Sequence, residues 1–158
     1  MQTTSPAEVL DAFQRAVDRN QLLIATNQLE SRVTESLGCP VLYFDKPAWH
    51  NRGQVAVPGQ IFFSIWMDEK GRLNYNIHAL KLRHLKAYKL EGRKFAEAFR
   101  TAFDPTGWPN VSTDFGPLTL MQGWIDQNDQ QLDSLIQRIV GIEHTIDELL
   151  HDRIVPKV

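Results

Sequence analysis

Two histidines and a glutamate near the end of the chain have the spacing of a helical metal site. His144, Glu148 and His151 lie four and three residues apart. On a helix they share one face, where two imidazoles and a carboxylate can converge on a divalent cation. The same face lies opposite the Leu and Ile positions of that helix, where nothing behind the histidines orients them. We therefore interpret it as a solvated polar face, and the sequence predicts no metal site and no cofactor.

A second group of reactive side chains lies in a turn-rich segment. Asp45, His50 and Arg52 could act as base, acid and anion clamp, and loops are free to carry such residues. Nothing in the sequence fixes their mutual geometry, and the chain has no nucleotide-binding loop and no nucleophile motif. We therefore assign no catalytic residue and lean towards a protein that is not an enzyme. A small-ligand protein or enzyme with a polar site near His50, Arg52 and His78 stays as an alternative.

Polar and apolar side chains alternate along residues 72–79. The polar positions are Arg72, Asn74, Asn76 and His78, and the apolar ones are Leu73, Tyr75, Ile77 and Ala79. Because successive side chains of a strand point to opposite faces, the polar set shares one face of a sheet. Such a face can line a polar pocket, whereas a solvent-facing strand is the simpler interpretation. The candidate ligand-binding residues are His50, Arg52, Asn74, Asn76 and His78.

Opposite charges are concentrated in two segments of the chain. Residues 72–100 carry eight basic and two acidic side chains, a local charge of +6, whereas residues 114–152 carry eight acidic side chains and one arginine, a local charge of −7. A basic segment can bind nucleic-acid phosphates, and the candidates are Lys81, Arg83, Lys86, Lys89, Arg93, Lys94 and Arg100. The net charge of −2 and the pI near 6.2 do not resemble those of strongly basic nucleic-acid-binding domains. We therefore favour solvated or self-complementary charges over nucleic-acid binding.

Composition is typical of a globular protein of one domain. At 158 residues and 42% hydrophobic content, the chain can bury one sizeable core without disulfide or metal support. Its single cysteine, Cys39, cannot form an intrachain disulfide and fits a reducing compartment as a small buried residue. We find no signal-peptide pattern and no apolar stretch of membrane-spanning length. The expected location is the cytoplasm, without membrane association.

Capping signals and periodicity predict two helices at the start of the chain. Ser5 and Pro6 open the first helix, and Glu8 is placed to complete a capping box. The apolar face then changes, which predicts a break near Arg19–Gln21 and a second helix that ends at Gly38.

Changes of period define the remaining elements. We predict a strand at 41–44, a short edge strand at 54–57, a β-hairpin of 60–67 and 72–79, a helix at 92–103, a strand at 118–125 and a final helix from Asp126 or Asn128 to about Arg153. Residues 80–91 fit either a strand continued past a bulge or a helix. The sequence therefore predicts a single α+β domain over residues 1–158. Its antiparallel sheet is built around the central hairpin and packs against N-terminal helices, a middle helix and a long C-terminal helix.

Part of the sequence resembles a family of small α+β proteins. The stretch GQIFFSIWMDEKGRLNYNI, residues 59–77, is followed by a helix and then by Gly123-Trp124-Ile125 before the final helix. This order resembles the hairpin and Trp-strand-helix close of MmcQ/YjbR-like proteins. The resemblance implies a small α+β domain whose family has a poorly defined role, sometimes associated with nucleic-acid binding. The chain departs from that pattern in its long N-terminal extension and in the length of residues 80–118, so no functional residue is carried over.

The favoured function is that of a non-enzymatic interaction module that associates with itself. In the helix at 92–103, Phe95, Phe99 and Phe103 form an apolar stripe that leaves the basic residues outward. The final helix is likewise apolar on one side and acidic on the other. Opposite charges on two exposed helices can meet between subunits. We therefore expect a homodimer in which the final helix takes part.

Overall fold

The computed structural model describes residues 5–36, 38–46, 49, 61–79, 88–89, 92–112, 119–153 and 155–156. Its elements in chain order are α1 (Pro6–Thr26), β1 (Glu30–Ser36), β2 (Cys39–Asp45), β3 (Ile61–Met67), β4 (Leu73–Ala79), β5 (Tyr88–Lys89), α2 (Gly92–Ala102), β6 (Thr119–Ile125), α3 (Asp129–Arg153) and β7 (Val155–Pro156). Within these residues, no helix combines the length and the apolar character that crossing a membrane requires.

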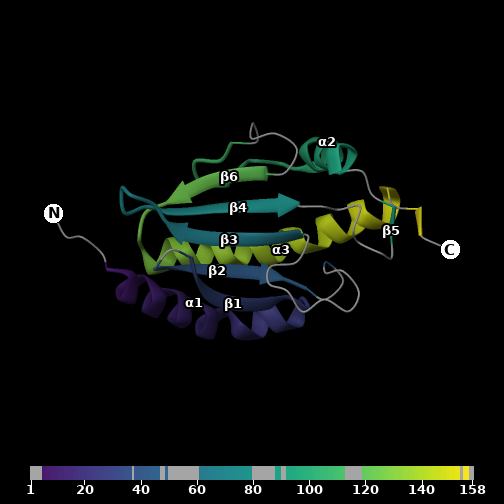
Figure 1. Cartoon of the computed structure of the whole chain (residues 1–158). Coiled ribbons are helices and arrows are strands. Elements are labelled where there is room, and N and C mark those ends of the chain that lie inside the picture. Colours follow the sequence, from purple (N-terminus) through teal and green to yellow (C-terminus); the bar gives the residue numbers. More distant parts are fainter. Residues whose placement is uncertain are drawn as a thin grey trace.

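One antiparallel sheet contains five of the strands, in the order β1-β2-β3-β4-β6. The first four strands pair in chain order, and β6 joins β4 after α2. The short strands β5 and β7 pair with each other. In Figure 1, α3 runs behind the sheet and α1 lies beside β1. This arrangement confirms the predicted α+β fold around the β3–β4 hairpin.

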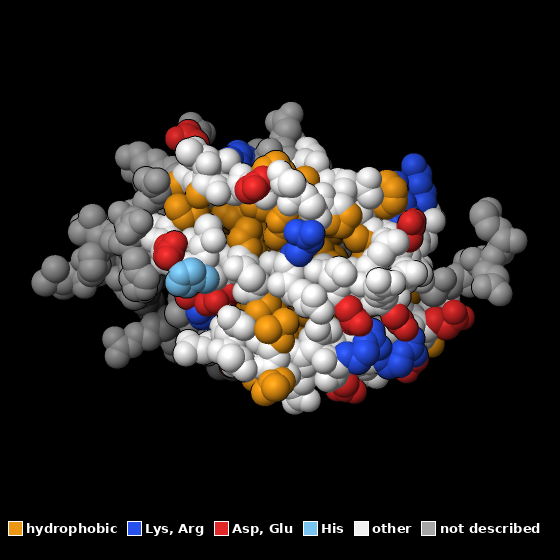
Figure 2. All heavy atoms as spheres, turned by 180° about the vertical axis from the view of Figure 1, so that it is seen from behind, with side chains coloured by type: hydrophobic (Ala, Val, Ile, Leu, Met, Phe, Trp, Pro, Cys, Tyr) orange, Lys and Arg blue, Asp and Glu red, His pale blue; other side chains and the backbone are white. Residues whose placement is uncertain are grey.

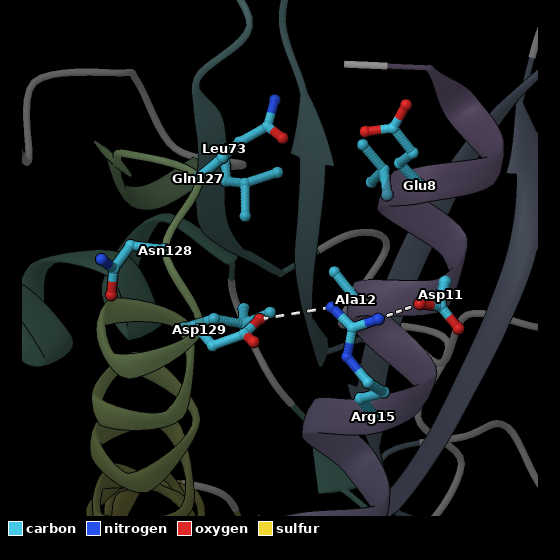
Figure 3. Close-up of a pocket in the computed structure, with 10 residues that line it drawn as sticks. Glu8, Asp11, Ala12, Arg15, Leu73, Gln127, Asn128 and Asp129 are labelled. Carbon is cyan, nitrogen blue, oxygen red and sulfur yellow. Dashed lines mark hydrogen bonds and ion pairs between the residues drawn. The ribbon is translucent and has the colours of Figure 1, made fainter.

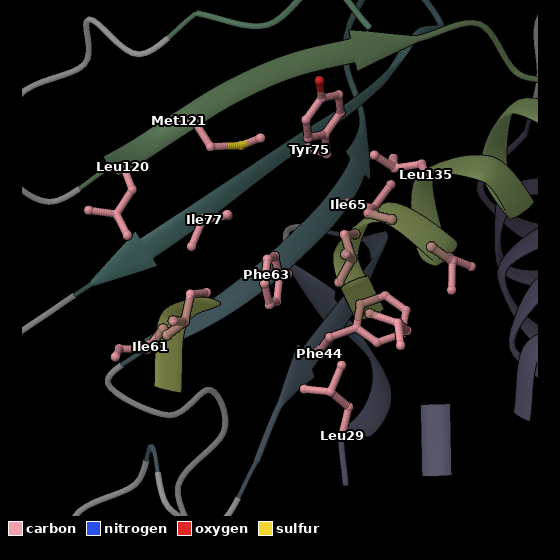
Figure 4. Close-up of a cluster of buried hydrophobic side chains, with 14 of the residues drawn as sticks. Leu29, Phe44, Ile61, Phe63, Ile65, Tyr75, Ile77, Leu120, Met121 and Leu135 are labelled. Atoms are coloured by element: carbon pink, nitrogen blue, oxygen red, sulfur yellow. The ribbon is translucent and has the colours of Figure 1, made fainter. Parts of the chain in front are cut away.

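The core lies between the sheet and the helices. Figure 4 shows side chains of β2, β3, β4 and β6 turned towards one cluster, among them Phe44, Phe63, Ile65, Tyr75, Ile77 and Met121. The helices contribute buried residues of their own: Phe13 from α1, Phe95 and Phe99 from α2, and Ile136 from α3. Each large apolar side chain buried in this way contributes about 1.5–3 kcal/mol. The apolar set predicted for residues 72–79 therefore lies in the core. The favoured interpretation of a solvent-facing polar set was wrong for Asn74 and Asn76, which are buried at 8% and 5% exposure.

The first helix begins as predicted but does not break. Ser5 Oγ accepts a hydrogen bond from the Glu8 backbone N–H at 3.2 Å. The predicted break near Arg19–Gln21 falls inside α1, where Asn20 is buried. Its amide donates to a backbone carbonyl one turn earlier and to the Asp133 carboxylate of α3. The break was therefore wrong, because contacts with α3 hold the helix continuous at this point.

The second predicted helix was also wrong over its later residues. Leu22 to Thr26 belong to α1, whereas Glu30–Ser36 form strand β1. The strand pairs with β2 in a register that runs from Glu30 opposite Asp45 to Ser36 opposite Cys39. Gly38, predicted as a helix cap, has a φ of 80° within the two-residue hairpin turn. A partner strand supplied by the next segment thus outweighs the helical spacing of the leucines. A single N-terminal helix covers the sheet.

The remaining predicted elements lie within two residues of the positions expected from sequence. Asn128 caps α3, since its side-chain oxygen accepts from the Gln131 N–H at 3.0 Å. Gly123, which weakened the β6 prediction, is required there: a Cβ would come within 2.6 Å of the Tyr75 ring. The predicted edge strand at 54–57 and the open segment 80–87 lie outside the described residues.

Candidate functional site

The sheet has one face that carries polar and aromatic side chains instead of core residues. We call it the helix-free face, because all three helices place their buried apolar side chains on the opposite face. Its described members are Glu30, Arg32, Thr34, Cys39, Val41, Tyr43, Asp45, Phe62, Ser64, Trp66, Asn74, Asn76, His78, Thr119, Gln122 and Trp124, as the strand register requires. Val41 and Phe62 are buried, yet neither belongs to the core cluster. This face is turned to the viewer in Figure 1.

A chain of hydrogen bonds crosses the middle of the helix-free face. Ser64 Oγ donates to Asn76 Oδ1 at 2.5 Å, and the Asn76 amide contacts His78 Nε2 at 2.8 Å. His78 Nδ1 lies 3.2 Å from Thr119 Oγ1. With the Asn76 amide as donor to Nε2, the imidazole N–H towards Thr119 Oγ1 is the one on Nδ1. The His78 ring also packs on Phe62, with centroids 5.1 Å apart.

A β-bulge brings Thr119 to His78. The β4–β6 register shifts between Ile77 and His78, so that Ile77 opposes Met121 while His78 opposes Thr119. Leu120 and Met121 consequently both belong to the core cluster. Without the extra residue, Leu120 would lie beside His78 and the hydrogen-bonded chain would end there.

Asn74 belongs to a different cluster, at the β3–β4 turn. Its amide donates to Asp68 at 2.6 Å, and the same carboxylate accepts from Arg72 Nε and from the backbone N–H groups of Lys70 and Arg72. Burial works to raise the pKa of Asp68, but the hydrogen bonds from Asn74 and Arg72 outweigh it and lower that pKa. The Arg72 guanidinium lies over the Trp124 ring, 4.5 Å from its centroid. The half-exposed end of the face is therefore built from paired charges and tryptophan rings.

The structure brings together part of the predicted ligand site. Asn76 and His78 join one network, and Asn74 shares their face but binds Asp68. The remaining members, His50 and Arg52, lie outside the described residues. Convergence of all five residues around one ligand thus stays a prediction.

Only one of the predicted nucleic-acid contacts has a described side chain. Arg100 donates to the backbone carbonyl of Thr119 at 3.1 Å and is half-buried. Positions 81, 83 and 86 lie outside the described residues, and only the backbone is described at positions 89, 93 and 94. The proposal of a basic nucleic-acid surface therefore stays a prediction.

A buried ionic cluster was missed by the sequence analysis. Lys46 Nζ contacts the carboxylates of Glu143 and Asp147 on α3, and Trp49 Nε1 donates to Asp147 at 3.0 Å. The Lys46 and Glu143 side chains are 7% and 9% exposed. The partners lie about a hundred residues apart in sequence, so the spacing of residues could not predict that they meet. The one available signal was Glu143 itself, a charge beside the apolar positions of the final helix.

The two carboxylates of this cluster respond differently to the same lysine. Burial raises the pKa of Glu143 despite the contact with Lys46. For Asp147, burial is outweighed by hydrogen bonds from Lys46 and Trp49, and the pKa is lowered. Burial opposes the charge of Lys46, yet the two carboxylates raise its pKa. The best-defined ion pair is therefore Lys46 with Asp147, and the cluster fastens the segment after β2 to α3.

A cavity of about 400 Å³ lies between the first turns of α1 and α3. Figure 3 shows Glu8, Asp11 and Asp129 around it, with Arg15 bridging the two aspartates. Because Arg15 already pairs with two of the acids, its charge is not free to bind an anionic ligand in this cavity. Among the described residues, no group of His, Cys, Asp or Glu side chains is placed to hold a metal.

The predicted polar face of the final helix is described in part. His144 and Glu148 lie 2.9 Å apart with side chains 76% and 62% exposed. The side chain of His151 lies outside the described residues.

Comparison with known proteins adds no constraint on function. The chain matches no model of a protein family, no curated protein and no solved structure. The resemblance to MmcQ/YjbR-like proteins thus stays a prediction.

Proposed function

We propose that this protein is a non-enzymatic interaction module that self-associates through the helix-free face of its sheet. The observation that carries the proposal is the register, which gathers Tyr43, Trp66 and Trp124 on one face, away from the core. All three aromatic side chains are only half-buried. A cytoplasmic location belongs to the same proposal, supported by Cys39, a half-buried unpaired thiol.

The composition of the helix-free face suits a protein interface. Trp, Tyr and Arg are the residue types that dominate binding energy at interfaces, whereas Lys and Glu are depleted there. The described part of this face contains Tyr43, Trp66 and Trp124, bordered by Arg72, and it has no lysine and one glutamate, Glu30. Amides between the rings can supply the hydrogen bonds that an interface needs.

The charges at this face favour a second copy as partner. Arg32 pairs with Glu30 at 2.9 Å, and Arg72 pairs with Asp68 at 3.1 Å. Because these charges are balanced within each chain, two identical faces meet without net repulsion. The row formed by Trp66, Asn74 and Trp124 crosses three neighbouring strands and gives each copy an aromatic strip.

The final helix has weaker support as the dimer interface. Its expected role rested on an acidic outer face, yet several of these acids bind basic residues of their own chain. Asp129 and Asp133 pair with arginines of α1, while Glu143 and Asp147 bind Lys46. Their charge is therefore satisfied internally and contributes little to attraction between subunits.

A matched pair of substitutions tests which surface associates. Gln122 lies half-buried on β6, the strand at one edge of the helix-free face, whereas Gln137 is exposed on α3. We expect wild-type protein to dimerise in sedimentation equilibrium, Gln122→Lys to weaken the dimer tenfold or more, and Gln137→Lys to leave it unchanged. A monomer at tens of micromolar, or a dimer weakened only by Gln137→Lys, would contradict the proposal.

A further inference from the structure

On the helix side of the molecule, a shallow groove exposes part of the core. It has a volume of about 270 Å³ and is lined by Ala102, Phe103, Asp104, Trp108, Arg138, Gly141, Ile142 and Thr145. Figure 2, seen from behind the sheet, shows apolar side chains gathered in a hollow with a basic side chain beside it. The aromatic wall is firm, because Phe103 and Trp108 pack edge to face at 5.6 Å and Trp108 also contacts Tyr75.

The floor of the groove contains a glycine that the fold itself does not require. Gly141 lies in the middle of the 25-residue helix α3, where glycine costs about 1 kcal/mol relative to alanine. A Cβ built at this position meets no atom within 4 Å, and no positive φ requires glycine there. The missing side chain therefore leaves open space above the helix backbone, within reach of a bound molecule.

Arg138 lies one turn before Gly141 and has no acidic partner among the described residues. A Cβ at Gly107 would come within 2.7 Å of an Arg138 guanidinium nitrogen, so the group packs closely against the loop backbone. The acid beside it, Asp104, accepts hydrogen bonds from Thr106, which lower the pKa of Asp104. The groove thus combines an apolar wall with one positioned cation that has no described acidic partner, and the exposed carboxylate of Asp104 also lies in its lining.

We propose that this groove binds a small organic carboxylate with an apolar body. The carboxylate pairs with the Arg138 guanidinium, whose fork of donors matches two carboxylate oxygens. The apolar body lies over Gly141 and Ile142 against Trp108, and the Thr145 hydroxyl lies at the far end. Arg138 and Thr145 are two helical turns apart, about 10 Å along the axis, which suits a medium-chain carboxylate. This site is separate from the helix-free face and stands without the proposed dimer.

Octanoate is the probe, with 1-octanol as its uncharged match, and binding is measured by isothermal titration calorimetry. We expect saturable octanoate binding with a Kd of about 1 mM or below, and octanol binding at least tenfold weaker. Arg138→Gln should weaken octanoate tenfold or more. Arg15→Gln, which alters an exposed arginine in the cavity between α1 and α3, should leave binding within twofold.

Substitutions at Gly141 that fill the groove distinguish an effect on ligand binding from an effect on stability. Gly141→Leu should abolish octanoate binding, while Gly141→Ala should weaken it and raise the thermal midpoint, because alanine favours the helix. The proposal is overturned if wild-type protein shows no saturable binding, if octanol binds as tightly as octanoate, or if Arg138→Gln has no effect. It is also overturned if Gly141→Leu dissociates a dimer in sedimentation without any carboxylate binding, since a second copy would then cover the groove.

Discussion

Asp68 shows how a single carboxylate organises one end of the helix-free face. It accepts from two backbone N–H groups and from the side chains of Arg72 and Asn74. The β3–β4 turn therefore depends on an ionised acid, and the same contacts hold Arg72 over Trp124. Changes at Asp68 should reach both the stability of the hairpin and the shape of the proposed interface.

Replacing Asp68 by Asn should make stability less dependent on acidity. The folded state lowers the pKa of Asp68 below its ordinary value of 3.8. Its contribution is therefore complete above that value and is lost as the pH falls through the lower, folded-state pKa. We expect Asp68→Asn to reduce the free energy of unfolding by about 1–2 kcal/mol at neutral pH. The difference from wild type should shrink below pH 3.8.

Urea unfolding at neutral pH and at about pH 2.5 measures this difference. Asp18→Asn, on the exposed side of α1, is the matched control and should cause little change at either pH. A constant difference between wild type and Asp68→Asn at both pH values would contradict the account.

The sequence predicted which side chains share a network only when those side chains belong to the same strand. Alternation along residues 72–79 placed Asn76 and His78 on a common face, and they do share one network. Their partners came from elsewhere: Ser64 through the hairpin register and Thr119 through a bulge in β6. Neither the register nor the bulge has a sequence signal strong enough to identify it in advance.

At the scale of elements, β1 shows why spacing alone misled. Leu29 and Val33 are four residues apart, as on a helical face, but the segment also alternates Arg32 and Thr34 with Val33. The sequence also allowed a hairpin here, because glycine favours tight turns. In the structure, Gly38 lies in the turn that joins β1 to β2. Pairing with β2 decided the outcome, since a hairpin satisfies the backbone of both segments.

The Lys46 cluster is the contact between elements whose loss should cost most. Lys46→Met leaves Glu143 and Asp147 near each other without their cation, in a largely buried site. We expect a loss of about 3 kcal/mol in the free energy of unfolding, measured with urea. Lys70→Met, at an exposed position in the β3–β4 turn, is the control and should cost little.

A second variant shows whether an unpaired buried charge causes the loss. Lys46→Met combined with Glu143→Met removes the more buried carboxylate as well, so it should recover part of the stability. If Lys46→Met costs less than about 1 kcal/mol, or if the double variant is no more stable than the single one, the cluster does not fasten the segment after β2 to α3.

The whole molecule separates two kinds of surface. The sheet turns an aromatic, charge-balanced face away from the helices. On the other side, α3 and the loop after α2 form a groove with an arginine that has no acidic partner in the described part of the chain. Composition and net charge gave no hint of this division, because it depends on which side of the sheet the helices occupy. The central claim is that two copies associate through the aromatic face.

Mixing oppositely charged variants tests that claim most directly. Gln122→Lys and Gln122→Glu each place like charges in both copies of the helix-free face, so each alone should be largely monomeric. An equimolar mixture gives one basic and one acidic face, which attract each other. Sedimentation equilibrium should then show a mixed dimer at concentrations where either variant alone is monomeric. A mixture as monomeric as its components, or variants that dimerise as tightly as wild type, would contradict the account.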